Sequence, residues 1–286
     1  MLEFQYDASV IRKNIILAGD AHFHLYPCFD FARIFSELIR NLDALVDVRV
    51  GQRTPSVPSD RNHETFRLAF LVENVKCDYF HDMAGKQFGD FQIVQGTEAN
   101  CLNVNKDGKA QLCLVASRQI VTMEKLEVLS LGMEEKIADG LPAGEIIEKI
   151  LAAGGIPVLP FSPGKWLFKR GRLAKSLVTK YGQKLVAGDS ALRPVGWGRP
   201  EIMRMAGGRI LPGSDPLPLP GEEKYAGQYG FVCQGMFDVS KPFTAIKEIV
   251  LNKPDTILAA GRRCSMLNVA GRLFRLKKLK KRPIDI

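Results

Sequence analysis

Apolar and polar positions follow two different rhythms near the start of the chain. Residues 14–18 form a short apolar run typical of a buried strand. Residues 29–46 place apolar side chains three or four positions apart, which predicts an amphipathic helix. After a loop at 51–63 that contains two prolines, the run 66–75 fits a strand or a helix equally well. The chain is therefore expected to begin with a β–α unit.

The middle of the chain has the pattern of antiparallel strands. Residues 91–94, 99–104 and 110–116 are rich in apolar side chains, and the turn Asn105–Lys106–Asp107–Gly108 separates the last two runs. A turn of this composition between two strand patterns predicts a β-hairpin.

Three later units repeat one plan, in which a helix ends at glycine and leads into a short apolar strand. The helices are expected at 143–153, 173–181 and 200–205, and the strands at 156–160, 184–189 and 209–215. Regular alternation of this kind favours parallel strands joined by right-handed crossovers. We therefore predict an α/β fold, namely a distorted (β/α) TIM-like barrel of seven or eight strands with an inserted β-hairpin.

The chain is expected to have three parts. These are a barrel at 1–230, a C-terminal helical extension packed on it at 231–271, and a basic tail at 272–286. The tail carries most of the net charge of +9, and its leucines 273, 276 and 279 form an apolar stripe beside the basic face. Such a tail suits an anionic surface or an acidic partner, although a solvated terminal helix has the same pattern.

Composition narrows the class of protein. With 286 residues and 46% hydrophobic side chains, the chain suits one large α/β domain. It has no apolar stretch long enough for a transmembrane segment and no signal-peptide pattern, so a cytoplasmic location is expected. The six cysteines are far apart and form no Cys-x-x-Cys pair, which argues against a disulfide framework or a zinc cluster.

The most informative motif is Asp20-x-His22-x-His24, at the end of the first strand. Because side chains alternate along a strand, all three are expected to point the same way at its carboxyl end. Two neighbouring imidazoles suit Zn, Mn or Fe, but further ligands are needed to complete a site. The alternative interpretation is that these are polar residues at a strand end whose hydrogen bonds are satisfied by neighbouring groups.

With these pieces in place, residues 14–220 resemble the PHP (polymerase and histidinol phosphatase) superfamily of metal-dependent phosphoesterases. His22-Phe23-His24 is similar to the first His-x-His motif of that family. The run 94–98 resembles its strand ending in Gly-x-Glu, and residues 154–160 resemble its glycine pair and apolar strand. Gly213-Ser214-Asp215 is similar to its late Gly-Ser-Asp.

The resemblance implies a divalent metal site, with Zn, Mn or Fe as one or two ions. The implied ligands are His22, His24, Glu98 and Asp215, of which Glu98 would bridge two metals. Two family histidines are replaced, one by Phe161 or Ser162 and one by the Pro216-Leu217 pair, so the three-metal site of the family is incomplete here.

Other residues are candidates for proton transfer and substrate binding. Asp189, at the end of a strand, and His81 are candidates for moving protons. The predicted contacts with an anionic substrate, made by cationic side chains and a stacking ring, are Lys165, Arg193, Arg199 and Trp197. Each also has a structural interpretation, such as a turn cap, a surface charge or loop packing.

These features predict a metal-dependent hydrolase, most simply a phosphoesterase acting on an anionic small-molecule or nucleotide-like substrate. One alternative is a mononuclear amidohydrolase-type enzyme that cleaves a C–N or ester bond. A second alternative is a catalytically inactive barrel that serves as a binding or scaffold protein through its basic tail.

Overall fold

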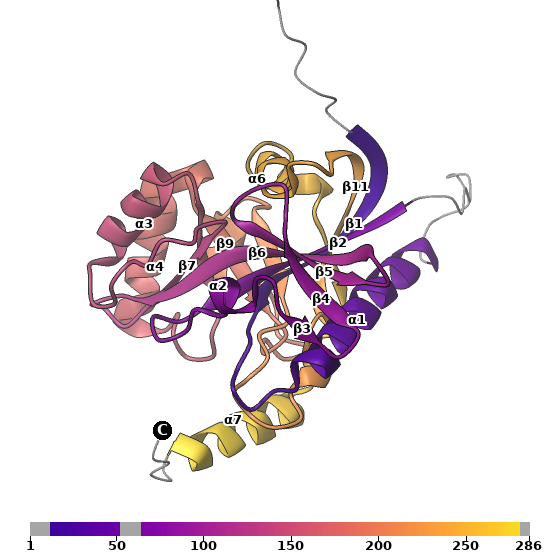
Figure 1. Ribbon diagram of the computed structural model, residues 1–286. Helices are drawn as coiled ribbons and strands as arrows, with labels where there is room; N and C mark the ends of the chain where they lie inside the picture. Colours follow the sequence, from indigo (N-terminus) through magenta and orange to yellow (C-terminus); the bar gives the residue numbers. More distant parts are fainter. Residues whose placement is uncertain (1–11, 52–63, 281–286) are drawn as a thin grey trace, which may run out of the picture.

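The structure is a computed structural model, and it describes residues 12–51 and 64–280. Most of the loop expected at 51–63 and the last six residues of the chain lie outside this range. The described chain is a mixed α/β fold around one sheet, shown in Figure 1. Nine strands follow one path in the order β10-β9-β8-β7-β6-β2-β1-β11-β12.

The strands on this path include every strand expected from the sequence in the repeated units. Their bounds are β1 (Arg12–Phe23), β2 (Glu64–Glu73), β6 (Lys109–Val121), β7 (Glu127–Leu131), β8 (Ile156–Pro160), β9 (Val186–Ser190), β10 (Ile210–Gly213), β11 (Tyr229–Asp238) and β12 (Leu258–Gly261). The run at 66–75, which fitted either element, is strand β2.

The sheet is nearly closed into a barrel. Strand β10, at one end of the path, contacts β1, and the backbone N–H of Asp215 donates to the carbonyl of His22 at 2.8 Å. Strands β1, β2 and β6 run parallel to one another, and β8, β9 and β10 run in the same direction. The carboxyl ends of all six strands therefore lie at one end of the barrel, which we call the carboxyl end.

The expected uniformly parallel order is wrong at two places. Strand β7 is antiparallel to both β6 and β8, because a tight turn rather than a helical crossover connects it to β6. Strand β11 pairs antiparallel with β1, and β12 with β11. The predicted hairpin is present: β5 (Cys101–Lys106) pairs with β6, and β4 (Phe91–Gln95) and β3 (Gln87–Phe88) extend it as a side branch.

Helices pack around the barrel-shaped sheet. They are α1 (Phe31–Gly51), α2 (Tyr79–Met83), α3 (Ala143–Ala152), α4 (Phe168–Tyr181), α5 (Glu201–Met205), α6 (Pro242–Asn252) and α7 (Met266–Lys280), with short 3₁₀ turns at Gly182–Lys184, Glu223–Tyr225 and Pro254–Thr256. In Figure 1, α3 and α4 lie at the left of the barrel and α1 at its right, and α7 lies at the bottom of the view. None of the helices in the described ranges is long and apolar enough to cross a lipid bilayer.

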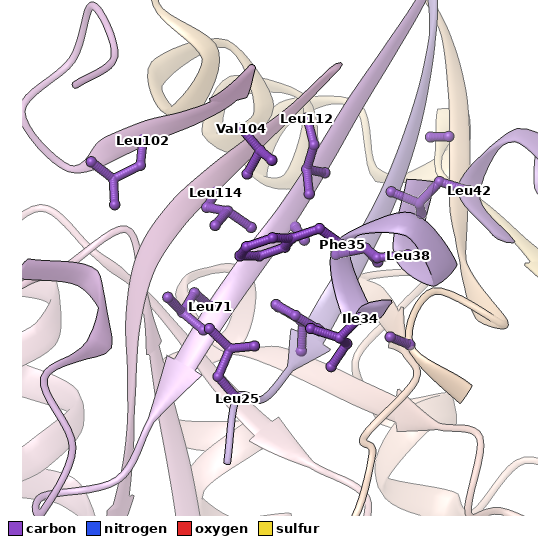
Figure 2. Close-up of a cluster of buried hydrophobic side chains, with 14 of the residues drawn as sticks. Leu25, Ile34, Phe35, Leu38, Leu42, Leu71, Leu102, Val104, Leu112 and Leu114 are labelled. Atoms are coloured by element: carbon purple, nitrogen blue, oxygen red, sulfur yellow. The ribbon is translucent and has the colours of Figure 1, made fainter. Parts of the chain in front are cut away.

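Side-chain alternation divides the core into layers. One buried cluster fills the barrel interior, with members such as Leu17, Phe70 and Val115. Alternate residues of the same strands face outward and pack under α1. Figure 2 shows Ile34, Phe35 and Leu38 of α1 pointing toward Leu71 and Leu114 of the sheet. The residues of each strand that face the interior therefore determine which side chains point into the barrel at its carboxyl end.

The C-terminal part differs from its expected form. The segment 231–271 was expected to be helical, but it also supplies most of β11 and all of β12. The residues from 272 onward continue α7, whose leucines 273, 276 and 279 pack against Leu192, Leu217 and Leu219. The apolar stripe of the tail is thus used to hold the helix on its own chain.

Candidate metal centre

Three side chains that are far apart in the sequence meet at the carboxyl end of the barrel. Two of them come from the end of β1, and the third comes from the residues after β10. The Nε2 atoms of His22 and His24 lie 3.9 and 3.7 Å from Oδ1 of Asp215, and the two imidazole rings are 4.7 Å apart. Possible ligand atoms of the three residues all lie within 4.8 Å of one another. In the described part of the chain, no other group of three His, Cys, Asp or Glu residues is placed in this way.

His24 has its ring orientation and tautomer fixed by the backbone. Its Nδ1 lies 2.6 Å from the carbonyl oxygen of Val72, on β2, and that oxygen can only accept a hydrogen bond. Nδ1 must therefore carry the proton, which leaves the lone pair of Nε2 facing Asp215. Burial lowers the pKa of His24 to about 4, with a further contribution from neighbouring His22. The ring is therefore neutral near pH 7, as a metal ligand must be.

Asp215 is held in position by both its backbone and its side chain. Its φ of 51° is left-handed, a conformation that Asp and Asn adopt more readily than other non-glycine residues. Its Oδ2 accepts a hydrogen bond of 3.1 Å from the hydroxyl of Ser190 on β9, and its backbone N–H is bound to His22. Oδ1 consequently remains directed toward the two histidines.

Asp20 does not join this group, although the sequence alternation suggested that it would. The pairing of β1 with β2 shifts register between Asp20 and Phe23, so the alternation is interrupted before His22. The Asp20 carboxylate instead accepts hydrogen bonds from the backbone N–H groups of His22, Ser214 and Gly227 and from the Ser214 hydroxyl. Burial raises the pKa of this carboxyl, and the hydrogen bonds oppose that effect. Its role is to fasten β1 to the residues that follow β10.

The three-residue donor set fits one divalent transition-metal ion. Two imidazoles and one carboxylate are the protein ligands of several catalytic zinc and iron sites, which keep further positions open. Tetrahedral ligands about 2.1 Å from an ion are roughly 3.4 Å from one another, so separations near 3.8 Å need little adjustment. The partners at Val72 and Ser190 supply the outer support that metal ligands usually have.

Two uncharged residues near this group were missed by the sequence analysis. Gln119 lies in the row of β6 that faces the barrel interior, and its Oε1 is 3.4 Å from Nε2 of His22. The Tyr26 ring lies 5.4 Å from that of His24. Burial raises the pKa of Tyr26 well above its usual value, and the nearby charge of Asp215 adds to this. Once the interior row of β6 is known, its period of two identifies Gln119.

Glu98 lies at a different place from the three clustered residues. Its carboxylate accepts hydrogen bonds from the backbone N–H groups of Phe243 and Thr244 and from the Thr244 hydroxyl, in the first turn of α6. The structure therefore does not bring the expected bridging ligand to His22, His24 and Asp215. Glu98 caps a helix because it follows β4, in the side branch formed by the hairpin strands.

Asp189 points to the outside of the barrel, where both of its carboxylate oxygens accept hydrogen bonds from other side chains. It follows the outward-facing Ala187 in the alternation of β9, so the neighbouring Ser190 faces the metal group instead. Both carboxylate oxygens of Asp189 bind Arg193, and the Tyr229 hydroxyl donates to it at 2.7 Å. Arg193 is correspondingly buried and committed to this pair. The structure gives both residues a structural contact rather than a place beside the three candidate ligands.

The remaining predicted residues are spread over the surface. His81 is exposed and lies between Asp78 and Glu134, at 2.9 and 3.2 Å, and these hydrogen bonds raise its pKa. Arg199 and Trp197 are exposed in the loop after β9. Lys165, after β8, forms an ion pair with Glu127. Since Glu127 begins β7, opposite Val121 at the end of β6, this pair lies at the carboxyl end of the barrel.

Fold and site together define a mixed α/β protein with a nearly closed barrel-shaped sheet and a candidate metal centre at its carboxyl end. No family model matches the chain, and no curated protein matches it in sequence. Among solved structures, the chain is similar to endonuclease Q of Pyrococcus furiosus, a lesion-specific endonuclease. The identity is 13% and the TM-score 0.46, over 82% of this chain and 56% of that one. The chain thus spans only about half of endonuclease Q.

Two further structures are similar to the chain. One is a two-domain protein from Bacteroides vulgatus that contains a predicted PHP-like metal-dependent phosphoesterase. Its identity is 11% and its TM-score 0.44, over 87% of this chain and 66% of that one. The other is PsfC from Pseudomonas syringae, with 8% identity and a TM-score of 0.48, over 93% of this chain and 99% of that one.

Proposed function

We propose that the chain is a metal-dependent hydrolase in which His22, His24 and Asp215 hold one divalent ion, Zn, Mn or Fe. The observation that carries this proposal is the convergence of His22 Nε2, His24 Nε2 and Asp215 Oδ1. Hydrogen bonds from His24 to Val72 and from Ser190 to Asp215 hold two of these side chains in place. A purely structural role would not require a neutral buried imidazole to face a second imidazole and a carboxylate.

An ion held at this centre would act as a Lewis acid, which would lower the pKa of a bound water and polarise a scissile ester. The protein supplies the orientation. Ser190 and Val72 fix two of the ligands, and Gln119 offers a carbonyl oxygen that can accept a hydrogen bond from a water or from the substrate. Tyr26 offers a hydroxyl that remains protonated, because burial raises its pKa. These neighbours favour hydrolysis, which needs a positioned water and a polarised bond.

We further propose that the substrate is anionic and carries a phosphoester. Among the predicted contacts, Lys165 lies at the carboxyl end of the barrel and is partly exposed. Arg193, in contrast, is buried in an ion pair with Asp189. An ammonium group at this end attracts a phosphate, and its ion pair with Glu127 holds it in place. The PHP resemblance of the motifs favours a phosphoester over other anions. The proposed size class is a small molecule or a nucleotide.

The test of the metal site is the metal content of the purified, untagged protein. We expect about one Zn, Mn or Fe ion per chain in the wild type, and its loss in His24→Ala. His81→Ala is the matched control, because it removes an exposed imidazole outside the group and should keep the ion. A wild-type protein that takes up no metal, even after reconstitution, would overturn the proposal and favour the scaffold alternative.

The test of the reaction class uses the metal-loaded protein with three kinds of substrate. Hydrolysis of p-nitrophenyl phosphate or bis(p-nitrophenyl) phosphate, abolished in His24→Ala, would support a phosphoesterase. Cleavage of a cyclic amide or p-nitrophenyl acetate, with neither phosphoester cleaved, would instead support the amidohydrolase alternative. The Lys165→Met variant should raise KM for the phosphoesters more than it lowers kcat, since Lys165 is proposed to bind rather than to react.

A further inference from the structure

The C-terminal helix α7 has one face that is already used. Val269 and Arg272 are buried, and the leucines 273, 276 and 279 pack on the segment that follows Asp215. The Arg272 guanidinium forms a buried ion pair with Glu222 and stacks 4.2 Å from the centre of the Tyr225 ring. This face is therefore firmly held, which fixes the direction of the opposite face.

The opposite face of α7 is also apolar. Leu267 is 85% exposed and Phe274 is 70% exposed, so they rank among the most exposed large hydrophobic side chains of the described residues. Seven residues separate them, which is two helical turns, so both lie along one line on the outer surface. Ala270 and Gly271 lie between them on this line and are also exposed. Water-exposed side chains of this size, aligned on a docked helix, indicate a surface that another body covers.

The same face is strongly basic. Lys277 and Lys278 follow Phe274, Arg275 flanks it, and no acidic residue occurs in the sequence between Asp255 and Asp285. Neither lysine forms an ion pair with a carboxylate within the described residues. A row of bulky apolar side chains bordered by unpaired lysines is typical of helices that lie in the interface of an anionic bilayer.

A loop bound to the residues just before α7 also exposes apolar side chains. The backbone N–H of Val195 donates to Cys264 at 2.9 Å, and the Arg263 guanidinium donates to the carbonyl of Trp197 at 3.2 Å. The loop is therefore fastened to the residues just before α7. Val195 and Trp197 are 59% and 47% exposed. A half-exposed indole suits the boundary between head groups and acyl chains, because one edge is apolar and the other can hydrogen-bond.

We propose that the outer face of α7, with Leu267, Phe274, Lys277 and Lys278, binds an anionic lipid bilayer. The charge argues against a second copy of the chain, because a symmetric contact would bring the same lysines together. The aliphatic Leu267 argues against single-stranded nucleic acid, whose bases need ring faces for stacking. A bilayer accommodates both groups, since the apolar side chains enter the acyl boundary while the lysines reach lipid phosphates.

The experiment is sedimentation of the full chain with vesicles. Vesicles of phosphatidylcholine alone are compared with vesicles that also contain phosphatidylserine, at low and at high salt. We expect binding only to the anionic vesicles, with partitioning weakened by salt. Leu267→Ser/Phe274→Ser should lower partitioning by about tenfold or more. The matched control is Met236→Ser/Leu258→Ser, which removes two exposed apolar side chains on β11 and β12 and should bind as the wild type does.

Four results would overturn the proposal. The first is no binding of the wild type to anionic vesicles, and the second is equal binding by Leu267→Ser/Phe274→Ser. The third is tight binding of a single-stranded oligonucleotide that displaces the protein from vesicles. The fourth is a dimer in the absence of vesicles that Leu267→Ser/Phe274→Ser abolishes. Because the replaced residues are exposed, unfolding midpoint and metal content should stay at wild-type values and show that each variant is folded.

Discussion

At the scale of the residue, Arg272 and Glu222 form the most enclosed ion pair among the described residues of the C-terminal half. Their side chains are 3% and 0% exposed, and the Glu222 carboxylate also accepts from the backbone N–H of Leu217. The Arg272 guanidinium contacts Cys264 as well, so its donors are used by buried partners. Removal of one partner would leave the other charge in the core without compensation.

We therefore expect Arg272→Met to lower the free energy of unfolding by about 3–5 kcal/mol, because it isolates the Glu222 carboxylate. The double variant Arg272→Met/Glu222→Leu should recover part of this loss. Arg275→Met, on the exposed side of α7, should change the stability by no more than about 0.5 kcal/mol. Urea unfolding followed by circular dichroism measures all three. Equal losses in Arg272→Met and Arg275→Met would contradict this account.

Sequence reasoning singled out His22, His24 and Asp215, which the structure brings together, but it did not find the residues that hold them in place. The histidines were recognised from their spacing, and Asp215 from its position after a strand in the Gly-Ser-Asp motif. Asp189 was expected at the site because it ends a strand, but the structure places Ser190 beside Asp215 instead. All five residues of β9 are buried, so no alternation of polar and apolar residues shows in the sequence which of them face inward. Glu98 was expected at the site because a strand precedes it, but that strand belongs to the side branch.

At the scale of the element, Glu98 acts as a cap for a helix far away in the sequence. The residue before α6, Lys241, makes no side-chain capping hydrogen bond, and the first turn instead donates to the Glu98 carboxylate. The negative charge also lies at the positive end of the helix dipole. The contact joins the β4–β5 turn to α6.

We expect Glu98→Ala to destabilise the protein by about 1 kcal/mol, the usual cost of a lost helix cap, and to leave the metal content unchanged. Glu98→Gln should cost less, since an amide oxygen still accepts from the helix N–H groups. Chemical unfolding and elemental analysis of the same samples test the two halves of this expectation. Loss of metal in Glu98→Ala, with its fold retained, would return Glu98 to the ligand set.

Most elements were predictable from local pattern, but two strand directions were not. The helices at α3 and α6 and the strands β8 to β10 follow from their periodicity and terminal glycines or prolines. The antiparallel direction of β7 depends on the short turn between Val121 and Glu127, which the sequence analysis did not single out. Strand β11 was missed because its partner, β1, lies more than two hundred residues away in the sequence.

At the scale of the whole molecule, a bound ion should stabilise the fold, because its ligands come from the end of β1 and from the residue that follows β10, which are far apart in the sequence. At a free metal concentration of 100 times Kd, binding to the native state alone raises the free energy of unfolding by about 2.7 kcal/mol. We expect EDTA to lower the midpoint of thermal unfolding of the wild type accordingly.

The matched variant for this experiment is Asp215→Asn. Asparagine tolerates the left-handed backbone of this position, so the variant removes the carboxylate charge without adding backbone strain. EDTA should have much less effect on its unfolding midpoint. An equal EDTA effect in wild type and Asp215→Asn would mean that the stabilising ion binds elsewhere.

The contacts that close the barrel have a consequence for how the chain acquires its site. Asp20 and Ser214, which lie 194 residues apart in sequence, are joined by hydrogen bonds next to the candidate ligands. Contacts of such separation form only after the intervening chain has been ordered, so they contribute late in folding. A nascent chain still on the ribosome at residue 200 has both histidines but no Asp215. The ion should therefore be captured only after synthesis has passed β10, which makes metal uptake a reporter of completed folding.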